Sequence, residues 1–228
     1  MEKISINVIA RMHSDFATKF GIPRQSGLVE ELRSTIVFEP EYRNNDALRG
    51  IEDFSHLWII WQFSEAVRQG WSPTVRPPRL GGNTRMGVFA TRSPYRPNPI
   101  GLSSVKIEKI DYTSTDGPVI YVSGADMMDN TPIYDIKPYL PYTDSHPDAQ
   151  GGFALEPPKQ RVEVEIQQDI FNKIPDEKRN ALIQVLEQDP RPAYQNSPER
   201  VYGFEFSGME IRFRVEEDIL TVVEIIYK

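Results

Sequence analysis

A stretch rich in proline and glycine, residues 71–101, restricts the fold of this chain more than any other feature. Proline fixes φ and cannot donate a backbone hydrogen bond, so most of the stretch cannot be helical. Its glycines permit tight turns and a close approach of other backbone segments. Only residues 85–91 have the apolar and β-branched content of a strand. The stretch therefore predicts a long, stiff loop that contains one short strand.

The charged side chains of this region are all basic. No Asp or Glu lies between Glu65 and Glu108, although the whole chain has a net charge of −7. Arginine is the preferred side chain for bidentate contact with a carboxylate or a phosphate. Two explanations remain open: the basic residues pair with acidic side chains elsewhere, or they bind an anionic ligand. The basic residues of the interval are Arg68, Arg76, Arg79, Arg85, Arg92, Arg96 and Lys106.

The composition excludes several classes of protein and of site. The 228 residues are 39% hydrophobic, which is enough for a core, and no apolar run is long enough for a membrane helix. There is no cysteine, and the three histidines show no ligand spacing, so we expect neither disulfides nor a metal site. We expect a cytoplasmic protein that does not bind membranes. Because the net charge is negative, any nucleic acid must bind at a local basic patch.

Strand patterns dominate the first part of the chain. Segments 4–11, 34–40, 52–63, 101–112 and 119–122 predict strands, of which the very apolar 52–63 predicts a buried central one. A short helix is expected at 44–48 and a hairpin across 111–117. Residues 129–132 predict a tight turn, because Asn130 tolerates positive φ and Pro132 fixes its own φ. Many strands with few helices between them predict an antiparallel barrel over residues 1–140.

A second, smaller unit is expected after a linker at residues 141–158. The patterns predict a strand at 161–166, a helix at 175–187 and a stiff loop at 189–194. Three further strands are predicted at 201–206, 209–215 and 220–227, the first two joined by a turn at Ser207-Gly208. The expected fold class is therefore mainly β: a barrel-like, non-Rossmann N-terminal domain followed by a small α+β domain over residues 159–228.

Several of these motifs resemble the TsaA-like family. They are residues 75–83 (VRPPRLGGN), 87–94 (GVFATRSP), 96–101 (RPNPIG), 135–139 (DIKPY) and 189–194 (DPRPAY). The resemblance spans nearly the whole chain and is closest to the bacterial members that methylate N6 of adenine 37 in tRNA. It implies an S-adenosylmethionine-dependent methyltransferase on a β-barrel, acting as a homodimer. The implied acceptor is N6 of threonylcarbamoyladenosine at position 37 of threonine tRNA, in the anticodon loop.

The resemblance also implies where the cofactor binds. In the family the contacts come from a Pro-Arg-Gln loop, the start of a Ser-His-Leu-Trp strand, the Arg of Ala-Thr-Arg-Ser, the residue after Pro-Ile-Gly, and an Asp-x-Thr-Pro turn. Asn130 departs from the glycine most expected in that turn, but it also accepts positive φ. The matching positions are Pro23, Arg24, Gln25, His56, Leu57, Arg92, Leu102, Asp129, Asn130, Thr131 and Pro132.

The chemistry of such a reaction assigns further roles. Either Arg92 or Arg24 is expected to bind the cofactor's carboxylate, and either Asp129 or Asp135 to accept the N6 proton. Bases in a single-stranded loop stack on aromatic or guanidinium planes. The candidates for stacking are Tyr95, Tyr139 and Tyr194, and those for contact with tRNA or its modified base are Arg76, Arg79, Arg96 and Arg191.

Three other functions remain open from the sequence. A nonenzymatic RNA-binding module would use the same arginine-rich loop without binding the cofactor. A methyltransferase that acts on a small metabolite would be indifferent to tRNA. A metal-dependent hydrolase would use Asp126, Asp129 and Asp135, which lie within ten residues but lack the spacing of a known metal loop.

Overall fold

The computed structural model describes residues 3–155, 162–191 and 197–228. By their internal contacts the residues form two compact units. The first, here called the barrel unit, consists of Met1–Asp15, Arg24–Val67 and Asn98–Asp144. The second unit consists of Phe16–Pro23, Arg68–Pro97 and Ser145–Lys228. Each unit thus combines segments that are distant in the sequence.

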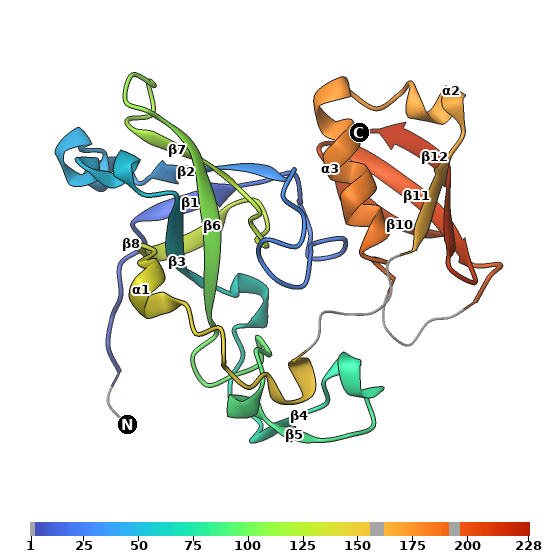
Figure 1. Cartoon of the computed structure of the whole chain (residues 1–228), viewed down its shortest axis with the longest axis horizontal. Coiled ribbons are helices and arrows are strands. Elements are labelled where there is room, and N and C mark those ends of the chain that lie inside the picture. Colours follow the sequence, from blue (N-terminus) through green and yellow to red (C-terminus); the bar gives the residue numbers. More distant parts are fainter. Residues whose placement is uncertain (1–2, 156–161, 192–196) are drawn as a thin grey trace. The chain divides into compact units, whose positions relative to one another are not determined.

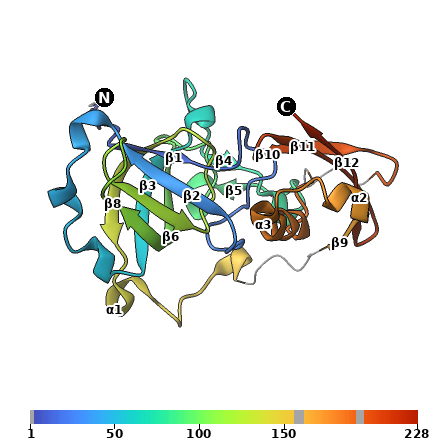
Figure 2. The same cartoon turned by 90° about the horizontal axis from the view of Figure 1, so that it is seen from above.

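The barrel unit is a closed antiparallel β-barrel, which confirms the predicted fold class (Figures 1 and 2). Around the barrel the strands follow the order β1-β2-β7-β6-β3-β8, and β8 pairs with β1 to close it. The strands are β1 (Ala10–His13), β2 (Arg33–Phe38), β3 (His56–Gln62), β6 (Ile100–Asp111), β7 (Val119–Ser123) and β8 (Thr131–Pro138).

Alternation of side chains along the strands fills the barrel. In β3, Leu57, Ile59 and Trp61 are buried, while the residues between them are only partly covered. As predicted, β3 is a central strand, between β6 and β8, and it has a buried inner face and a partly covered outer face. The predicted start of this strand was wrong, because residues 52 and 53 belong to the 3-10 turn η3 (Ile51–Asp53). In the neighbouring β6, Gly101 lies against Trp61, and a Cβ atom there would stand 2.3 Å from Cε2 of the indole. Glycine is required at this position by packing.

The structure differs from the sequence prediction at several strand positions. The first strand begins only at Ala10, and Ile4 and Ile6 are exposed, so the alternation at 4–9 does not reflect a paired strand. The segment 85–91 forms only a two-residue strand, β5 (Met86–Gly87), followed by a 3-10 turn, η6 (Val88–Ala90). Strand β8, which was not predicted, follows the predicted turn, in which Asn130 has the expected positive φ of 60°.

Short helical turns connect the strands. The helix expected at 44–48 is η2 (Asn45–Leu48), which the Asn44 side chain caps by accepting the Asp46 N–H. Helix α1 (Pro141–Asp144) occupies the start of the predicted linker, whose residues 156–158 lie outside the described part. The other turns are η1 (Pro40–Tyr42), η3 (Ile51–Asp53), η4 (Ser64–Ala66), η5 (Pro78–Leu80) and η7 (Gly152–Ala154).

The second unit contains a four-stranded mixed sheet of order β10-β11-β12-β9, in which β9 runs parallel to β12. Its elements are β9 (Glu163–Ile166), α2 (Gln168–Phe171), α3 (Asp176–Glu187), β10 (Tyr202–Phe206), β11 (Met209–Glu216) and β12 (Ile219–Tyr227). The predicted Ser207-Gly208 turn is present with both φ angles positive. This sheet confirms the α+β prediction; α2 was not predicted, and Arg161 of the predicted strand lies outside the described residues.

Phenylalanines from the N-terminal part of the chain complete the core of the second unit. The Phe16 ring packs edge-on against Phe206 at 5.5 Å, and Phe20 packs against Phe204 at 6.2 Å. Gly21 has a φ of 91° and lies directly against the Phe204 ring. Among the described residues, no helix has the length and apolar character needed to cross a membrane.

Candidate functional site

The outer face of β3 and β6 carries several of the predicted cofactor contacts. Side chains alternate along β6, so Leu102, Ser104 and Lys106 point away from the barrel interior. In the antiparallel register Leu102 lies opposite Ile60, and Lys106 lies opposite His56. His56 and Leu102 are thus separated by four positions, about 13 Å, along one continuous outer surface.

A cleft of about 380 Å³ opens on this surface. This volume lies within the range of small-molecule sites, about 300–1,000 Å³. His56 is the only one of the predicted cofactor contacts among its lining residues, and the loop after Gln25 reaches the cleft through Gly27. The lining residues are Gly27, Glu30, Glu31, Arg33, His56, Ser104, Lys106, Glu108, Ser123 and Gly124.

The charges in the cleft are organised around Glu108. Its carboxylate accepts the Ser123 hydroxyl at 2.7 Å and lies 3.3 Å from Lys106 Nζ and 3.6 Å from an Arg33 guanidinium nitrogen. The Ser123 hydrogen bond, followed by these two cations, holds the pKa of Glu108 below its usual value. Glu108 therefore stays ionised at neutral pH and is a poor proton acceptor. Its role in the cleft is to fix the positions of its partners.

Two glycines let the Arg24–Gln25 loop approach the end of β7. The Gly27 N–H donates to the Gly124 carbonyl at 2.9 Å, and the Gly124 N–H donates to the Leu32 carbonyl at 3.0 Å. A Cβ atom on Gly124 would lie 3.2 Å from the Gly27 backbone. Arg24 is exposed, and its side chain has no partner among the residues the structure describes. It is therefore available to an anion beside the cleft.

The predicted turn at Asp129 is tied to the first strand. One carboxylate oxygen of Asp129 lies 3.0 Å from His13 Nδ1 and accepts the Ser14 N–H at 3.2 Å, and the other accepts the Asn130 amide at 2.9 Å. The Ser14 hydroxyl donates to the Met127 carbonyl at 2.8 Å. With both oxygens engaged, Asp129 is better placed to hold this turn than to take a proton.

Three predicted cofactor contacts are buried. Leu57 belongs to the barrel core, Thr131 is 3% exposed at the start of β8, and Pro23 is also buried. Pro132 follows Thr131 and pairs with Arg11 of β1. The buried side chains are covered by protein, so these three positions can touch a ligand only through their main-chain atoms.

The remaining acidic candidates have separate partners. Asp135 accepts the Ile136 N–H at 2.9 Å and lies 2.8 Å from Lys137 Nζ. Asp126 accepts the Ser103 hydroxyl at 2.6 Å, and Ser103 in turn accepts the Trp61 indole N–H at 3.0 Å. No three His, Cys, Asp or Glu side chains converge within the described ranges in a way that could hold a metal ion. The series of hydrogen bonds from Trp61 through Ser103 to Asp126 could not be predicted from the sequence, because it depends on the register of β3 and β6.

Arg92 and Arg96 lie in a braced loop of the second unit. The Thr91 hydroxyl donates to the Val88 carbonyl at 2.9 Å and accepts the Ser93 N–H at 3.2 Å. Arg96 is half-buried and donates to the Thr91 carbonyl at 3.3 Å, so it helps to shape the loop. Arg92 is exposed on the same loop.

The candidate stacking residues have different surroundings. Tyr95 is 41% exposed, with the Arg68 guanidinium 4.0 Å from its ring centre. Tyr139 is half-buried beside Trp58, at 5.5 Å, and its N–H donates to the His56 carbonyl. Tyr194 lies outside the described residues.

The four candidate tRNA-contacting arginines also differ. Arg76 and Arg79 are exposed and have no partner within the described part of the chain. Arg191 does not fit the expectation: its side chain is only 8% exposed and forms a bidentate pair with Asp189, at 2.8 Å for each bond. A guanidinium in this arrangement stabilises its own loop, so we withdraw Arg191 as a direct contact.

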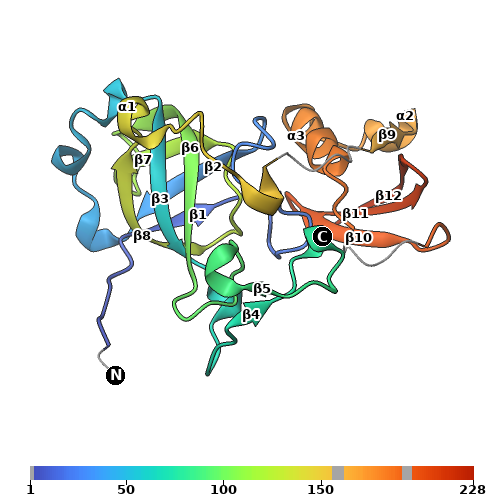
Figure 3. The same cartoon turned by 60° about the horizontal axis from the view of Figure 1, so that its bottom comes forward.

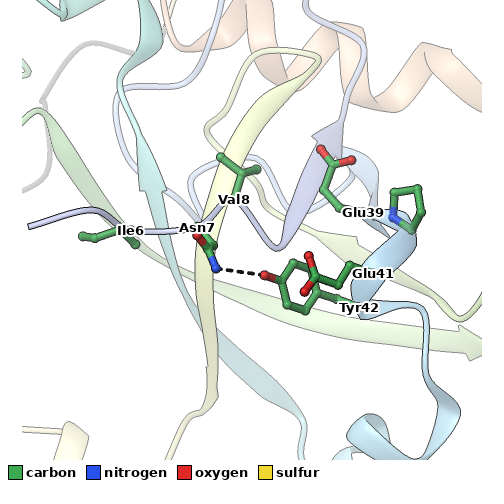
Figure 4. Close-up of a pocket in the computed structure, with 7 residues that line it drawn as sticks. Ile6, Asn7, Val8, Glu39, Glu41 and Tyr42 are labelled. Atoms are coloured by element: carbon green, nitrogen blue, oxygen red, sulfur yellow. Dashed lines mark hydrogen bonds between the residues drawn. The ribbon is translucent and has the colours of Figure 1, made fainter.

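A second concavity, of about 540 Å³, lies between the N-terminal segment and η1 (Figure 4). Its lining includes Glu39 and Glu41, and the Asn7 amide donates to the Tyr42 hydroxyl at 3.1 Å. None of the predicted site residues lines it, and Glu39 is paired with Arg11 at 2.8 Å. We therefore place the candidate site at the cleft on β3 and β6.

Comparison with known proteins places the chain in a family. Residues 11–145 match the model of the tRNA-methyltransferase O N-terminal domain, and residues 159–228 match the model of the TrmO C-terminal domain. The chain is 40% identical over 225 residues to a tRNA (adenine(37)-N6)-methyltransferase of Escherichia coli K12, covering 95% of both chains. It is 48% identical over 171 residues to the protein of that name from Eikenella corrodens, covering 74% of this chain and 95% of the relative.

A solved structure supports the same assignment. The crystal structure of TrmO from Pseudomonas aeruginosa superposes with a TM-score of 0.81 at 30% identity, covering 99% of both chains. The similarity therefore extends over both units and is not limited to the barrel strands.

Proposed function

The chain belongs to the tRNA-methyltransferase O family and is an S-adenosylmethionine-dependent tRNA (adenine(37)-N6)-methyltransferase, and we propose that its acceptor is N6 of threonylcarbamoyladenosine in threonine tRNA. The match of two family models to nearly the whole chain carries the assignment to the family. It disfavours a nonenzymatic RNA-binding module and a methyltransferase of small metabolites. For the threonylcarbamoyl group, the support is electrostatic: its carboxylate would pair with the guanidinium group of Arg76 or Arg79, neither of which has a partner among the described residues.

S-adenosylmethionine would bind on the outer face of β3 and β6. When bound, it supplies an electrophilic methyl group and carries a carboxylate, an adenine and a positive charge. The cleft has the volume for part of such a molecule, and Glu30 contributes an acidic side chain to its lining. For the carboxylate, Arg92, which the family motif indicates, and Arg24, whose loop reaches the cleft through Gly27, remain the two candidates. Main-chain groups of the Asp129 turn would read the adenine.

Positioning should carry most of the catalysis. The lone pair of an exocyclic N6 is delocalised, so the acceptor must be held about 3–3.5 Å from the methyl carbon and in line with the bond that breaks. Of the two carboxylates considered as proton acceptors, Asp135 is less tied than Asp129. Its partner Lys137 is 61% exposed at the side chain, and exposed ion pairs of this kind contribute little stability and open readily.

The acceptor is tested by offering two forms of the same tRNA. Threonine tRNA that carries the threonylcarbamoyl group should be methylated at least roughly 100-fold more efficiently than its unmodified transcript, because a buried or paired carboxylate contact is worth about 3 kcal/mol. The measurement is kcat/KM with radiolabelled methyl donor, followed by mass analysis of the nucleosides. Equal rates on the two substrates would reject the proposed acceptor while leaving adenine 37 as the site of methylation.

We further propose that the protein is a cytoplasmic homodimer, as the family resemblance implies. Sedimentation equilibrium of the purified protein at micromolar concentration tests the dimer. A molecular mass that stays at the 26.2 kDa of one chain would contradict it.

A further inference from the structure

The arginine-rich segment displays two large aromatic rings to solvent. Trp71 is 55% exposed and Phe89 is 71% exposed, and their ring centres lie 6.0 Å apart with an interplanar angle of 35°. Aromatic side chains of this size are normally largely buried, and neighbouring exposed ones mark interaction surfaces. We call Trp71 and Phe89 the aromatic pair.

A short hairpin holds the aromatic pair in place. Strand β4 (Thr74–Val75) pairs with β5, with Thr74 opposite Gly87 and Val75 opposite Met86 (Figure 3). The Val88 N–H donates to the Pro73 carbonyl at 2.9 Å and extends this pairing toward the two rings. The rings thus stand at the base of a hairpin whose backbone is fixed by hydrogen bonds and prolines.

The rest of the hairpin is cationic. Arg76 follows β4, Arg79 lies in η5 at the tip, and Arg85 precedes β5. All three are exposed, and none has a partner among the residues that the structure describes. These exposed guanidinium groups give the hairpin a local positive charge on a chain that is acidic as a whole.

From this juxtaposition we propose that the aromatic pair stacks on an unpaired base of the tRNA anticodon loop while the hairpin arginines contact the flanking phosphates. Surfaces that bind single-stranded nucleic acids combine these two elements. A base inside a duplex is covered on both faces by its neighbours, so the aromatic pair adds affinity for the unpaired bases of a loop. This inference rests on the proposed function, because tRNA is the substrate, and it adds residues that the sequence motifs did not indicate.

An apolar protein partner fits this surface less well than RNA. A contact between two copies of the chain would bring Arg76, Arg79 and Arg85 of one copy close to the same unpaired charges of the other, or would have to neutralise them. The phosphates of RNA would pair with these arginines directly and release counterions. We therefore treat self-association through the aromatic pair as the outcome that contradicts the proposal.

The test compares two RNAs of equal length and charge, a hairpin with the anticodon loop and a blunt duplex. Trp71→Ala should weaken binding of the hairpin roughly 5- to 100-fold, the range for loss of one base stack, and leave binding of the duplex unchanged. Trp71→Phe should restore much of the loss. The matched comparator is the double variant Arg76→Ala/Arg79→Ala, which should weaken both RNAs and flatten the salt dependence of their affinities. Fluorescence anisotropy over a salt series gives these affinities.

Two further measurements decide the result. In methyl transfer, Trp71→Ala should raise KM for tRNA and leave KM for S-adenosylmethionine unchanged. With 2-aminopurine in the loop, the wild-type protein should quench its fluorescence and Trp71→Ala should not. Unchanged hairpin affinity, equal weakening of both RNAs, or a shift from dimer to monomer without loss of RNA binding would overturn the proposal. If the wild-type protein binds the hairpin in this way but methylates no tRNA, the proposed function fails and the stacking surface stands.

Discussion

Replacing Gly101 by alanine should lower the free energy of unfolding by about 3 kcal/mol, the upper part of the range for an overpacked core. The added Cβ would stand 2.3 Å from Cε2 of Trp61. That indole cannot easily move, because its N–H is bonded to Ser103 at 3.0 Å and its ring packs on Phe63 at 4.2 Å. Urea unfolding, monitored by fluorescence, measures this lower stability as a lower urea concentration at the midpoint of unfolding.

Gly87→Ala is the matched control for this change. Gly87 has an ordinary φ of −57°, and a Cβ there meets no atom within 4 Å. The free energy of unfolding of Gly87→Ala should differ from that of the wild type by less than about 0.5 kcal/mol. If the two alanine variants unfold at the same urea concentration, the barrel accommodates the methyl group and the packing argument is wrong.

Arg92→Ala should weaken S-adenosylmethionine binding by roughly 100-fold. Two charge-assisted hydrogen bonds to a carboxylate are worth about 3 kcal/mol together, and each 1.4 kcal/mol is a factor of ten in Kd. The cofactor affinity of Arg92→Lys should lie between those of the wild type and Arg92→Ala, because lysine keeps the charge but loses the planar guanidinium. Titration calorimetry of the cofactor against each variant gives the three values.

The control for Arg92 is another exposed arginine of the same segment. Arg85→Ala removes an equal charge from a side chain without a partner in the described chain, and it should leave cofactor affinity within twofold of the wild type, or about 0.4 kcal/mol. An unchanged Kd in Arg92→Ala together with a loss in Arg24→Ala would transfer the carboxylate contact to Arg24. Losses of equal size in Arg92→Ala and Arg85→Ala would indicate a general effect of charge.

Most strands of the barrel were predictable because each has a recognisable local sequence pattern. Strands β2, β6 and β7 have β-branched or alternating residues between clear turn signals. The strand order and the closing strand β8 were not predicted, because they depend on pairing between distant segments. The N-terminal segment was misread because Ile4 and Ile6 alternate like a strand but are exposed. Local pattern carries no information on whether a neighbouring strand is present to pair with.

Family motifs predicted several candidate residues of the site, but the sequence did not predict which side chains contact one another there. Family motifs pointed to His56, Leu102 and the Asp129 turn, but the partners Glu108 and Ser123 enter the cleft through the register of β6 with β7. Arg191 was chosen for its type and its motif, and only the structure shows that Asp189 occupies it. Long-range pairing of this kind cannot be read from one sequence.

The interleaving of the two units has a consequence for how the protein is made. A ribosome delivers the chain from its N-terminus, yet β1 has to wait for β8 before the barrel can close. Phe16 and Phe20 have to wait longer still, until Phe204 and Phe206 have emerged. Splitting the gene at the predicted linker would therefore yield a C-terminal fragment that lacks two of its own core aromatics. We therefore expect nascent chains that have not yet reached Phe204 and Phe206 to expose apolar surface, which favours binding by chaperones at the exit tunnel.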